Sequence, residues 1–280
     1  MTRLLAPWTT AAALALAAAL SAAPATAGIL DEIKARKEIV VGTEAGYAPF
    51  EFVKDGKIIG YHADLFALVM KDLTEQGVKI TQLDVPFQSL LAGLQGKKFD
   101  AVVTALFATE ERARRFAFTV PTAVGTATII TRADNAAVTK PEDLSGKVVG
   151  APQGTRYLAA ARALSEDLAR KGRAPIKELR EYVGFAEIYT DVENGRLDAT
   201  LNGLPNALYL IKQQPGKYKT AGQLGEQTFF SWATRKEDQE LADWFSQRIL
   251  ALKKDGTLRE LQIKWFGGPM DVPDQVVYAK

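Results

Sequence analysis

Cysteine is absent from this chain of 280 residues, and histidine occurs once, at His62. A protein without cysteine has no disulfide, no thiolate metal site, no sulfur nucleophile and no lipid attached through sulfur. A single imidazole excludes sites that need two, such as an HExxH zinc site, and leaves any Ser-His-Asp triad dependent on His62. We therefore expect no metal and no cofactor, and we predict that His62 lies at the surface or caps a helix.

An excess of charge is also absent. The 35 Lys and Arg residues nearly balance the 33 Asp and Glu residues, which leaves a formal net charge of +2. That balance provides no strong field for nucleic acid or an anionic membrane, so we expect neither as a partner. Hydrophobic residues make up 47% of the chain, enough for an ordinary globular core in one large or two medium domains.

The first 27 residues have the pattern of an export signal. Arg3 supplies a positive start, residues 4–20 are apolar and rich in alanine, and residues 25–27 are Ala-Thr-Ala, the small-x-small pattern of a cleavage site. A transmembrane anchor is the alternative, but Pro24 and the polar sequence that follows disfavour it. No later stretch reaches about 18 apolar residues. We predict cleavage after Ala27 and a protein released into the periplasm of a Gram-negative cell.

Strands and helices alternate along the rest of the chain in two rounds. The first round predicts strands at 38–43, 78–85 and 99–105 and helices at 61–75, 88–95 and 110–115. The second predicts strands at 127–131, 147–150, 197–201 and 229–235 and helices at 155–170, 185–194, 204–212, 236–254 and 257–266. Such alternation is typical of a largely parallel sheet with helices on its faces.

A short internal repeat supports two similar halves. Residues 96–102 read Gly-Lys-Lys-Phe-Asp-Ala-Val, and residues 195–200 read Gly-Arg-Leu-Asp-Ala-Thr, each between a predicted helix and a predicted strand. We therefore predict an α/β fold of two Rossmann-like lobes. Ligands of open α/β sheets bind beyond the carboxyl ends of the strands, so a ligand would lie between two such lobes.

Motifs in a fixed order then carry a family resemblance. They are Val-Gly-Thr-Glu at 41–44, Tyr-Ala-Pro-Phe-Glu-Phe at 47–52, Gly-Tyr at 60–61, Leu-Leu-Ala-Gly-Leu at 90–94, Thr-Glu-Glu-Arg at 109–112, Leu-Ser-Gly-Lys-Val-Val-Gly at 144–150, Gln-Gly-Thr at 153–155 and Lys-Trp-Phe-Gly at 264–267. From about residue 30 to residue 267, the chain resembles the periplasmic solute-binding proteins of polar amino-acid ABC transporters. These form family 3 of the bacterial extracellular solute-binding proteins, with the type II periplasmic binding protein fold.

The resemblance implies two lobes joined by a two-strand hinge. Lobe 1 would comprise residues 28–124 plus 229–280, and lobe 2 residues 125–228. The lobes would close on an amino acid or a related small carboxylate, and the protein would deliver it to an inner-membrane ABC permease. A protein of this kind is a monomer and not an enzyme, and it needs no catalytic residue.

Arg112 and the pair Gly154 and Thr155 are the predicted carboxylate clamp. A guanidinium can hold a carboxylate through two parallel charge-assisted hydrogen bonds, and the Arg of this motif does so in the family. The N–H groups at a helix start attract anions, which suits Gly154 and Thr155 at the start of the helix predicted from 155. The alternatives are that Arg112 pairs with Glu110 or Glu111 at the surface and that Thr155 is only a helix cap.

Further residues are assigned by the resemblance. Tyr47 and Phe87 would lie against the ligand, and Phe107 would narrow the pocket because it replaces a small polar residue frequent in the family. Glu44 would meet the side chain of a cationic ligand, and the open alternative is a solvated loop acid. Phe50 is expected in the core.

Two departures from the family concern charge. The acid that holds the ligand's ammonium in the family stands five residues after the Asp of the Gly-basic-x-Asp motif, and that position is Gly203 here. Arg156 stands where a small hydroxyl residue is usual. A buried ammonium without a counter-charge is costly. Either Glu44 or Asn202 takes over the amine, or the ligand is an acidic or N-substituted amino acid or another carboxylate.

An enzyme on the same scaffold is the alternative function. The fold also hosts a cyclohexadienyl or arogenate dehydratase, which would need a carboxylic acid aimed at a leaving hydroxyl. Glu44 is the candidate for that acid.

Overall fold

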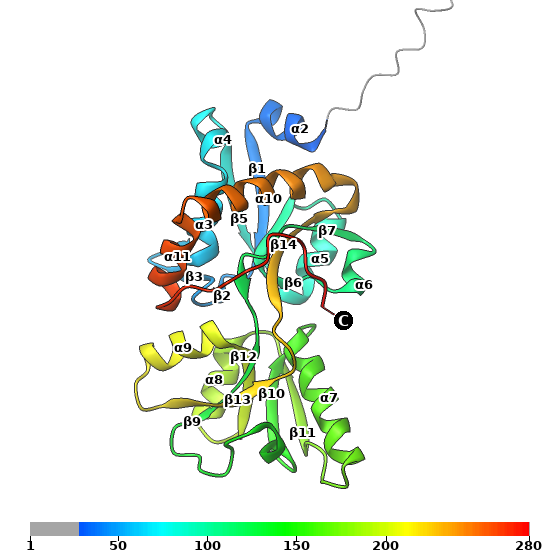
Figure 1. The fold of residues 1–280 in the computed structure, drawn as a ribbon, viewed down its shortest axis with the longest axis vertical. Coiled ribbons are helices and arrows are strands. Elements are labelled where there is room, and N and C mark those ends of the chain that lie inside the picture. The colour runs from blue at the N-terminus through cyan, green and yellow to red at the C-terminus, as the bar shows by residue number, and fades with distance from the viewer. Residues whose placement is uncertain (1–27, 280) are drawn as a thin grey trace, which may run out of the picture.

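The computed structural model describes residues 28–279, so the predicted export signal at residues 1–27 lies outside the described residues. Two lobes are stacked along the long axis of the molecule, each around its own sheet (Figure 1). The middle of the chain, green to yellow in Figure 1, forms the lower lobe, and both ends belong to the upper lobe. Within residues 28–279, no helix combines the length and the apolar character needed to cross a membrane.

The upper lobe is built on a six-stranded sheet in the order β5-β1-β6-β14-β7, with β8 also paired to β14. Its strands are β1 (Glu38–Thr43), β5 (Lys79–Asp84), β6 (Ala101–Phe107), β7 (Phe116–Phe118), β8 (Ala123–Val124) and β14 (Phe229–Arg235). Its helices are α2 (Ile29–Arg36), α3 (Tyr61–Val69), α4 (Lys71–Glu75), α5 (Phe87–Gln95), α6 (Glu110–Ala113), α10 (Gln239–Lys254) and α11 (Thr257–Phe266), with the 3-10 turn η2 (Lys236–Asp238). A small separate sheet contains β2 (Gly46–Tyr47), β3 (Glu51–Lys54) and β4 (Lys57–Ile59).

The lower lobe repeats the plan with five strands in the order β11-β10-β12-β9-β13. Its strands are β9 (Ala127–Arg132), β10 (Val148–Pro152), β11 (Glu178–Tyr182), β12 (Ala199–Gly203) and β13 (Tyr218–Leu224). Its helices are α7 (Arg156–Arg170), α8 (Phe185–Glu193) and α9 (Leu204–Gln213), with the 3-10 turn η1 (Pro141–Leu144). In each lobe three strands are parallel, and the strand that arrives from the other lobe, β14 in the upper sheet and β9 in the lower, pairs antiparallel to one of them. The sheets are therefore mixed, and the expected parallel arrangement covers only part of each.

The internal repeat has the same structural role in both lobes. The Asp100 carboxylate accepts a hydrogen bond from Val40 N at 2.9 Å, and the Asp198 carboxylate accepts one from Val148 N at 2.8 Å. Each aspartate also donates its own N–H to the carbonyl of the same partner residue, at 2.7 Å and 2.9 Å respectively. The aspartate thus accepts a hydrogen bond from a buried backbone N–H where two parallel strands meet, β1 and β6 in the upper lobe and β10 and β12 in the lower. These bonds fix the register of each pair.

Two antiparallel segments connect the lobes. The chain descends from β8 to β9 and returns from β13 to β14, and Gly125 N donates to Thr228 O at 2.6 Å between the two crossings. A Cβ at Gly125 would lie 2.7 Å from the Phe107 ring and 2.8 Å from the Phe230 ring. Only glycine therefore fits where the crossing segment passes these two rings.

The prediction for His62 is wrong, because its side chain is fully buried in the upper lobe. Burial lowers the pKa of His62 to about 3 and raises the pKa of the buried Glu51 well above its usual range. Both groups are therefore neutral: the Glu51 carboxyl donates to His62 Nδ1 at 2.5 Å, and His62 Nε2 donates to Thr122 Oγ1 at 2.9 Å. Thr122 Oγ1 then donates to Phe230 O at 3.2 Å, so this chain of bonds ends on β14 at the lobe connection.

The strand and helix predictions were best where the apolar pattern was strong. Strands β1 and β14 and helix α11 have the predicted bounds. The strands β11 and β13 were missed because they are the two edges of the lower sheet and carry many exposed polar residues. The short strands β2, β3, β4 and β7 were also missed, and the predicted helix 61–75 is divided at Met70.

Replacing Asp198 tests the role of the repeat. We expect Asp198→Ala to lower the free energy of unfolding by about 2 kcal/mol, because Val148 N would lose its acceptor in a partly buried place. Denaturant unfolding measures this. The control is Asp134→Ala, whose exposed ion pair with Arg132 is expected to contribute less than about 1 kcal/mol. Equal effects of the two variants would contradict the assigned role.

Candidate functional site

The two lobes touch through a group of hydroxyl and amide side chains. Tyr47 of the upper lobe donates its hydroxyl to Asn202 Oδ1 at 2.7 Å, and its oxygen lies 2.9 Å from the Tyr157 hydroxyl oxygen in the lower lobe. Asn206 Nδ2 donates across the same junction to Ala48 O at 2.7 Å. All of these side chains are buried except at Ala48, so the junction excludes solvent.

Aromatic rings surround these hydroxyl groups. Phe107 lies edge-on to Tyr157, with ring centroids 5.8 Å apart, and packs on Phe230 at 4.5 Å. Tyr47 stacks on Phe185 at 5.2 Å, and Phe185 stacks in turn on Tyr189 at 5.7 Å. Tyr47 and Phe107 were predicted as site residues from the sequence, whereas Tyr157, Phe185 and Tyr189 were missed.

A signal for the missed rings was present. Tyr157 stands in the first turn of α7, shortly after β10, and Phe185 is the first residue of α8, shortly after β11. Both therefore follow the carboxyl end of a parallel strand, where open α/β sheets place their ligands. The missed strand β11 concealed this relation for Phe185.

Arg112 is the most constrained cation at the junction. Its guanidinium donates to Phe107 O at 3.0 Å and, across the lobes, to Gly154 O at 3.2 Å, and it lies 5.9 Å from the centre of the Phe87 ring. Burial lowers its pKa to about 10, while the charge of Glu111 opposes that shift, so the group stays ionised at neutral pH. Among the ion pairs of residues 28–279, none includes Arg112. The predicted surface pairing with Glu110 or Glu111 is thus not what the structure has.

The loop before Arg112 is held from both sides. Thr109 caps α6 by accepting from Arg112 N at 3.2 Å. The end of the chain adds a second support, because Ala279 N donates to Ala108 O at 2.7 Å and Glu110 N donates to Ala279 O at 3.2 Å. These bonds fix the backbone from which the Arg112 side chain extends.

Gly154 and Thr155 lie opposite Arg112. Gly154 has φ +70°, a conformation that favours glycine, and its carbonyl accepts the cross-lobe bond from Arg112. The Thr155 hydroxyl donates to Pro152 O at 2.8 Å and accepts from Leu158 N at 3.3 Å. Thr155 is therefore the N-cap of α7, and this role is compatible with the one predicted for it at the ligand.

Gly203, the position where the family resemblance predicts an ammonium-binding acid, is closely surrounded by other side chains. A Cβ built on Gly203 would lie 3.0 Å from the Tyr157 hydroxyl oxygen and 2.9 Å from Asn206 Oδ1. Asn202 has both ends of its amide in use: the oxygen also accepts from Gly203 N at 2.7 Å, and the nitrogen donates to Tyr189 at 2.6 Å. The Tyr157 hydroxyl and the Asn206 amide oxygen therefore lie close to Gly203.

Glu44 lies near these tyrosines, in the loop after β1. Burial raises its pKa to about 8, together with the repulsion that an ionised Glu44 would meet from Asp84 and from Glu51 if that group also ionised. The neighbouring Asp84 is held in place because its carboxylate accepts from Ala45 N at 2.9 Å. Glu44 therefore carries a proton at neutral pH. The alternative interpretation from the sequence, a solvated acid in a loop, does not describe it.

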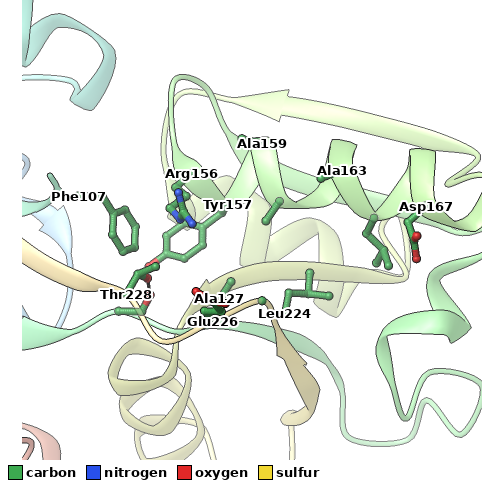
Figure 2. A pocket seen from close by; sticks show the side chains of 14 residues that line it. Phe107, Ala127, Arg156, Tyr157, Ala159, Ala163, Asp167, Leu224, Glu226 and Thr228 are labelled. Carbon is green, nitrogen blue, oxygen red and sulfur yellow. Dashed lines mark hydrogen bonds between the residues drawn. The ribbon is translucent and has the colours of Figure 1, made fainter. Parts of the chain in front are cut away.

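Several cavities adjoin the junction; Tyr47 lines one of them and Tyr157 lines another. The clamp cavity, 470 Å³, is lined by Arg112, Gly154, Thr155 and Arg156 among others. The tyrosine cavity, 240 Å³, is lined by Tyr47, Tyr189 and Asn202 among others. The α7 groove, 440 Å³, runs beside α7 from Phe107 and Tyr157 toward Asp167 and is lined also by Arg156 (Figure 2).

The structure thus gathers the predicted site residues into two groups. Arg112, Gly154, Thr155 and Arg156 share one cavity, and Tyr47 and Asn202 share another. Phe87 lies beneath the Arg112 guanidinium, and Phe107 lines the α7 groove.

Comparison with known proteins identifies relatives over most of the chain. Residues 39–268 match the profile of the bacterial extracellular solute-binding proteins, family 3. The L-cystine-binding protein TcyJ of Escherichia coli (strain K12) is 30% identical over 258 residues, which cover 91% of this chain and 92% of that protein. The histidine-binding periplasmic protein of the same organism is 31% identical over 238 residues, covering 82% and 88% respectively.

A solved structure agrees with this fold. The ancestral amino acid-binding protein AncCDT-1, described as a precursor of cyclohexadienyl dehydratase, is 32% identical with a TM-score of 0.72. The match covers 86% of this chain and 100% of that structure. The two-lobed α/β fold predicted from the sequence is thereby confirmed.

The raised pKa of Glu44 predicts a pH dependence of stability. Between the unfolded value of 4.5 and the folded value of about 8, the unfolded chain loses the Glu44 proton and the folded protein keeps it. The free energy of unfolding therefore falls as pH rises through this range. We expect the free energy of unfolding of Glu44→Gln, which cannot lose a proton, to rise by about 4 kcal/mol relative to wild type between pH 4 and pH 8. Denaturant unfolding at both pH values checks this, and a pH-independent difference between the two proteins would contradict it.

Proposed function

The chain belongs to family 3 of the bacterial extracellular solute-binding proteins, and we propose that it is the substrate-binding component of an amino-acid ABC transporter. It captures an amino acid or a related small carboxylate between its two lobes and presents it to an inner-membrane permease. We also propose that it works as a monomer in the periplasm, after removal of residues 1–27, and that it catalyses no reaction. The curated relatives named above are binding proteins, which supports this proposal.

The observation that carries the proposal is the Arg112 guanidinium. It is a half-buried cation between the lobes, and its guanidinium donates to two backbone carbonyl oxygens. A buried cation is stabilised far more by a carboxylate than by carbonyl dipoles, so an anionic ligand supplies what the site needs. The neighbouring Arg156 adds a second positive charge to the same cavity.

The roles of the other residues follow from their places. Gly154 and Thr155, at the start of α7, form the lower-lobe side of the clamp cavity. Phe87 supports the Arg112 guanidinium from the upper lobe. Tyr47 and Phe107 provide the ring surfaces, and Glu44, Asn202 and Gly203 complete the polar junction with Tyr157.

Opening and closing of the lobes would take place at the two crossing segments. We assign residues 28–124 and 229–280 to lobe 1 and residues 125–228 to lobe 2. The cross-lobe bonds from Tyr47, Arg112 and Asn206 exist only while the lobes touch, so they stabilise the closed arrangement. A ligand that contacts both lobes shifts the equilibrium further toward closure.

Arg112→Ala is the direct test. We expect the variant to bind its carboxylate ligand about a hundredfold more weakly, equivalent to about 3 kcal/mol, because truncation removes a buried ionic partner. Isothermal titration of the mature protein with L-histidine, L-cystine and L-glutamate measures this. Arg173→Ala, which changes an exposed arginine in the turn after α7, is the control and is expected to bind as wild type does. Unchanged affinity in Arg112→Ala would refute the assigned role.

One observation favours the dehydratase as a second candidate. Glu44 keeps its proton at neutral pH, as a general acid must. Against it, the Tyr47–Tyr157 contact closes the space next to Glu44 to a substrate in this arrangement.

Incubation with prephenate and with arogenate separates the two functions. We expect liquid chromatography to detect no product, since we propose that the site binds its ligand without catalysing a reaction. Turnover that disappears in Glu44→Gln would instead establish the enzyme.

A further inference from the structure

The last described residues of the chain lie against the loop that carries Arg112. Figure 1 shows the segment after α11, in red, running across the upper lobe toward α6. Ala279 N donates to Ala108 O at 2.7 Å, and Glu110 N donates to Ala279 O at 3.2 Å. These two bonds form a parallel β-bridge, so residues 268–279, the C-terminal segment, end as a short added strand beside the loop.

The loop needs such support because its own helix is short. Helix α6 is a single turn of four residues, Glu110–Ala113, and a helix of that length is not stable by itself. The first N–H groups of a helix have no partner within it. Here the Thr109 hydroxyl accepts from Arg112 N at 3.2 Å, while Glu110 N bonds to Ala279. The backbone of the loop is thus held partly from within and partly by the C-terminal segment.

The C-terminal segment is itself fixed to the upper lobe along its length. Met270 N donates to Gln262 Oε1 at 2.8 Å. Lys253 Nζ donates to Val272 O and forms an ion pair with Asp274. These contacts attach the start of the segment to α10 and α11, so its far end reaches the Arg112 loop from an anchored position.

Closer to that end, the segment packs on an apolar cluster of the upper lobe. Val276 lies against the cluster, and the Tyr278 ring meets Phe118 of β7 edge-on, with ring centroids 6.3 Å apart. Ala113 of α6 and the ring of Phe87, which lies beside the guanidinium, pack against the same cluster. The segment, α6 and Phe87 therefore share one apolar support.

The segment also borders the lower-lobe side of the site. Residues 277–279 line a cavity of 180 Å³ together with residues 226–229, which return from β13 to β14, and with Arg156. Arg156 also lines the clamp cavity with Arg112. Within the described chain, none of residues 268–279 lines the clamp cavity. The segment thus adjoins the site without supplying a wall of that cavity.

We propose that residues 276–279 are positioning residues for ligand binding, which hold the Arg112 loop in the arrangement that receives a carboxylate. The proposal rests on the function proposed above and extends it to residues outside the clamp cavity. A guanidinium that is held in advance loses less conformational freedom on binding, so a looser segment lowers ligand affinity. Ala279 acts through its backbone, while Val276 and Tyr278 fix that backbone on the apolar cluster.

Two substitutions at one position test the bridge. Ala279→Pro removes the N–H that donates to Ala108 O, and Ala279→Val is the matched control because it keeps that N–H. We expect Ala279→Pro to bind about fivefold more weakly, as the loss of one hydrogen bond implies, and Ala279→Val to change affinity less than about twofold. Titration calorimetry of the mature protein with L-histidine, L-cystine and L-glutamate measures this. Equal affinities of the two variants would overturn the proposal.

A double variant distinguishes positioning of Arg112 from a general loosening of the fold. In the Arg112→Ala background, we expect Ala279→Pro to change affinity for the same ligand less than about twofold, because no guanidinium is left to position. A further loss of about fivefold in that background would overturn the positioning role. Melting temperatures compared with wild type check that each variant is folded.

Hydrogen exchange of the ligand-free protein separates this inference from the proposed function. We expect the amide hydrogens of residues 108–113 to exchange faster in Ala279→Pro than in Ala279→Val, with exchange in the lower lobe unchanged. If none of the three amino acids binds to wild type, the proposed function fails, and localised faster exchange still supports the hold on the Arg112 loop. Equal exchange of residues 108–113 in the two variants overturns the proposal whatever the protein binds.

Discussion

The short contact between the Tyr47 and Tyr157 hydroxyl groups ties the two lobes together, and the arrangement around it follows from that contact. Each tyrosine follows the carboxyl end of a strand in its own lobe, so the two meet only because the sheets face each other. Both hydroxyl groups are buried, and each would be costly to bury without a partner. They find partners in one another and in Asn202, which in turn bonds to Tyr189 and to the backbone of Gly203. The lobes are therefore joined by a satisfied polar network within a shell of aromatic rings.

Charge at this junction is distributed unevenly. Arg112 stays ionised although it is half-buried, whereas Glu44 and Glu51 retain their protons because burial disfavours both carboxylates. The neutral Glu51–His62 pair adds no charge and instead connects the core of the upper lobe to the crossing segment through Thr122. At neutral pH the Arg112 guanidinium thus remains charged between the lobes, and this charge is the physical basis for the carboxylate ligand that we propose.

Some of the candidate site could be predicted and some could not. Arg112, Gly154 and Thr155 belong to motifs whose order along the chain indicates a role, and the structure places them around one cavity. The same motifs did not predict Tyr157 as a site residue, although it is next to Arg156 in the sequence. A tyrosine in the first turn of a helix does not by itself indicate a functional role. His62 was misplaced for a related reason: a histidine before an apolar helix suggests a cap, and only the fold brings Glu51 and Thr122 to its two ring nitrogens.

The sequence by itself determined the two-lobed α/β fold, since apolar periodicity is a local property and the repeated aspartate motif marks the same joint in each lobe. It also determined the overall balance of charge and the presence of glycine at Gly203, where the family resemblance predicts an acid. Only the tertiary structure decided what replaces that acid. Whether the space beside Gly203 is empty or filled depends on side chains from α7 and α9, and these reach it only after the strands between them have paired. The ionisation of Glu44 and Arg112 was decided in the same way, because a pKa responds to burial and to neighbours that are distant in the chain.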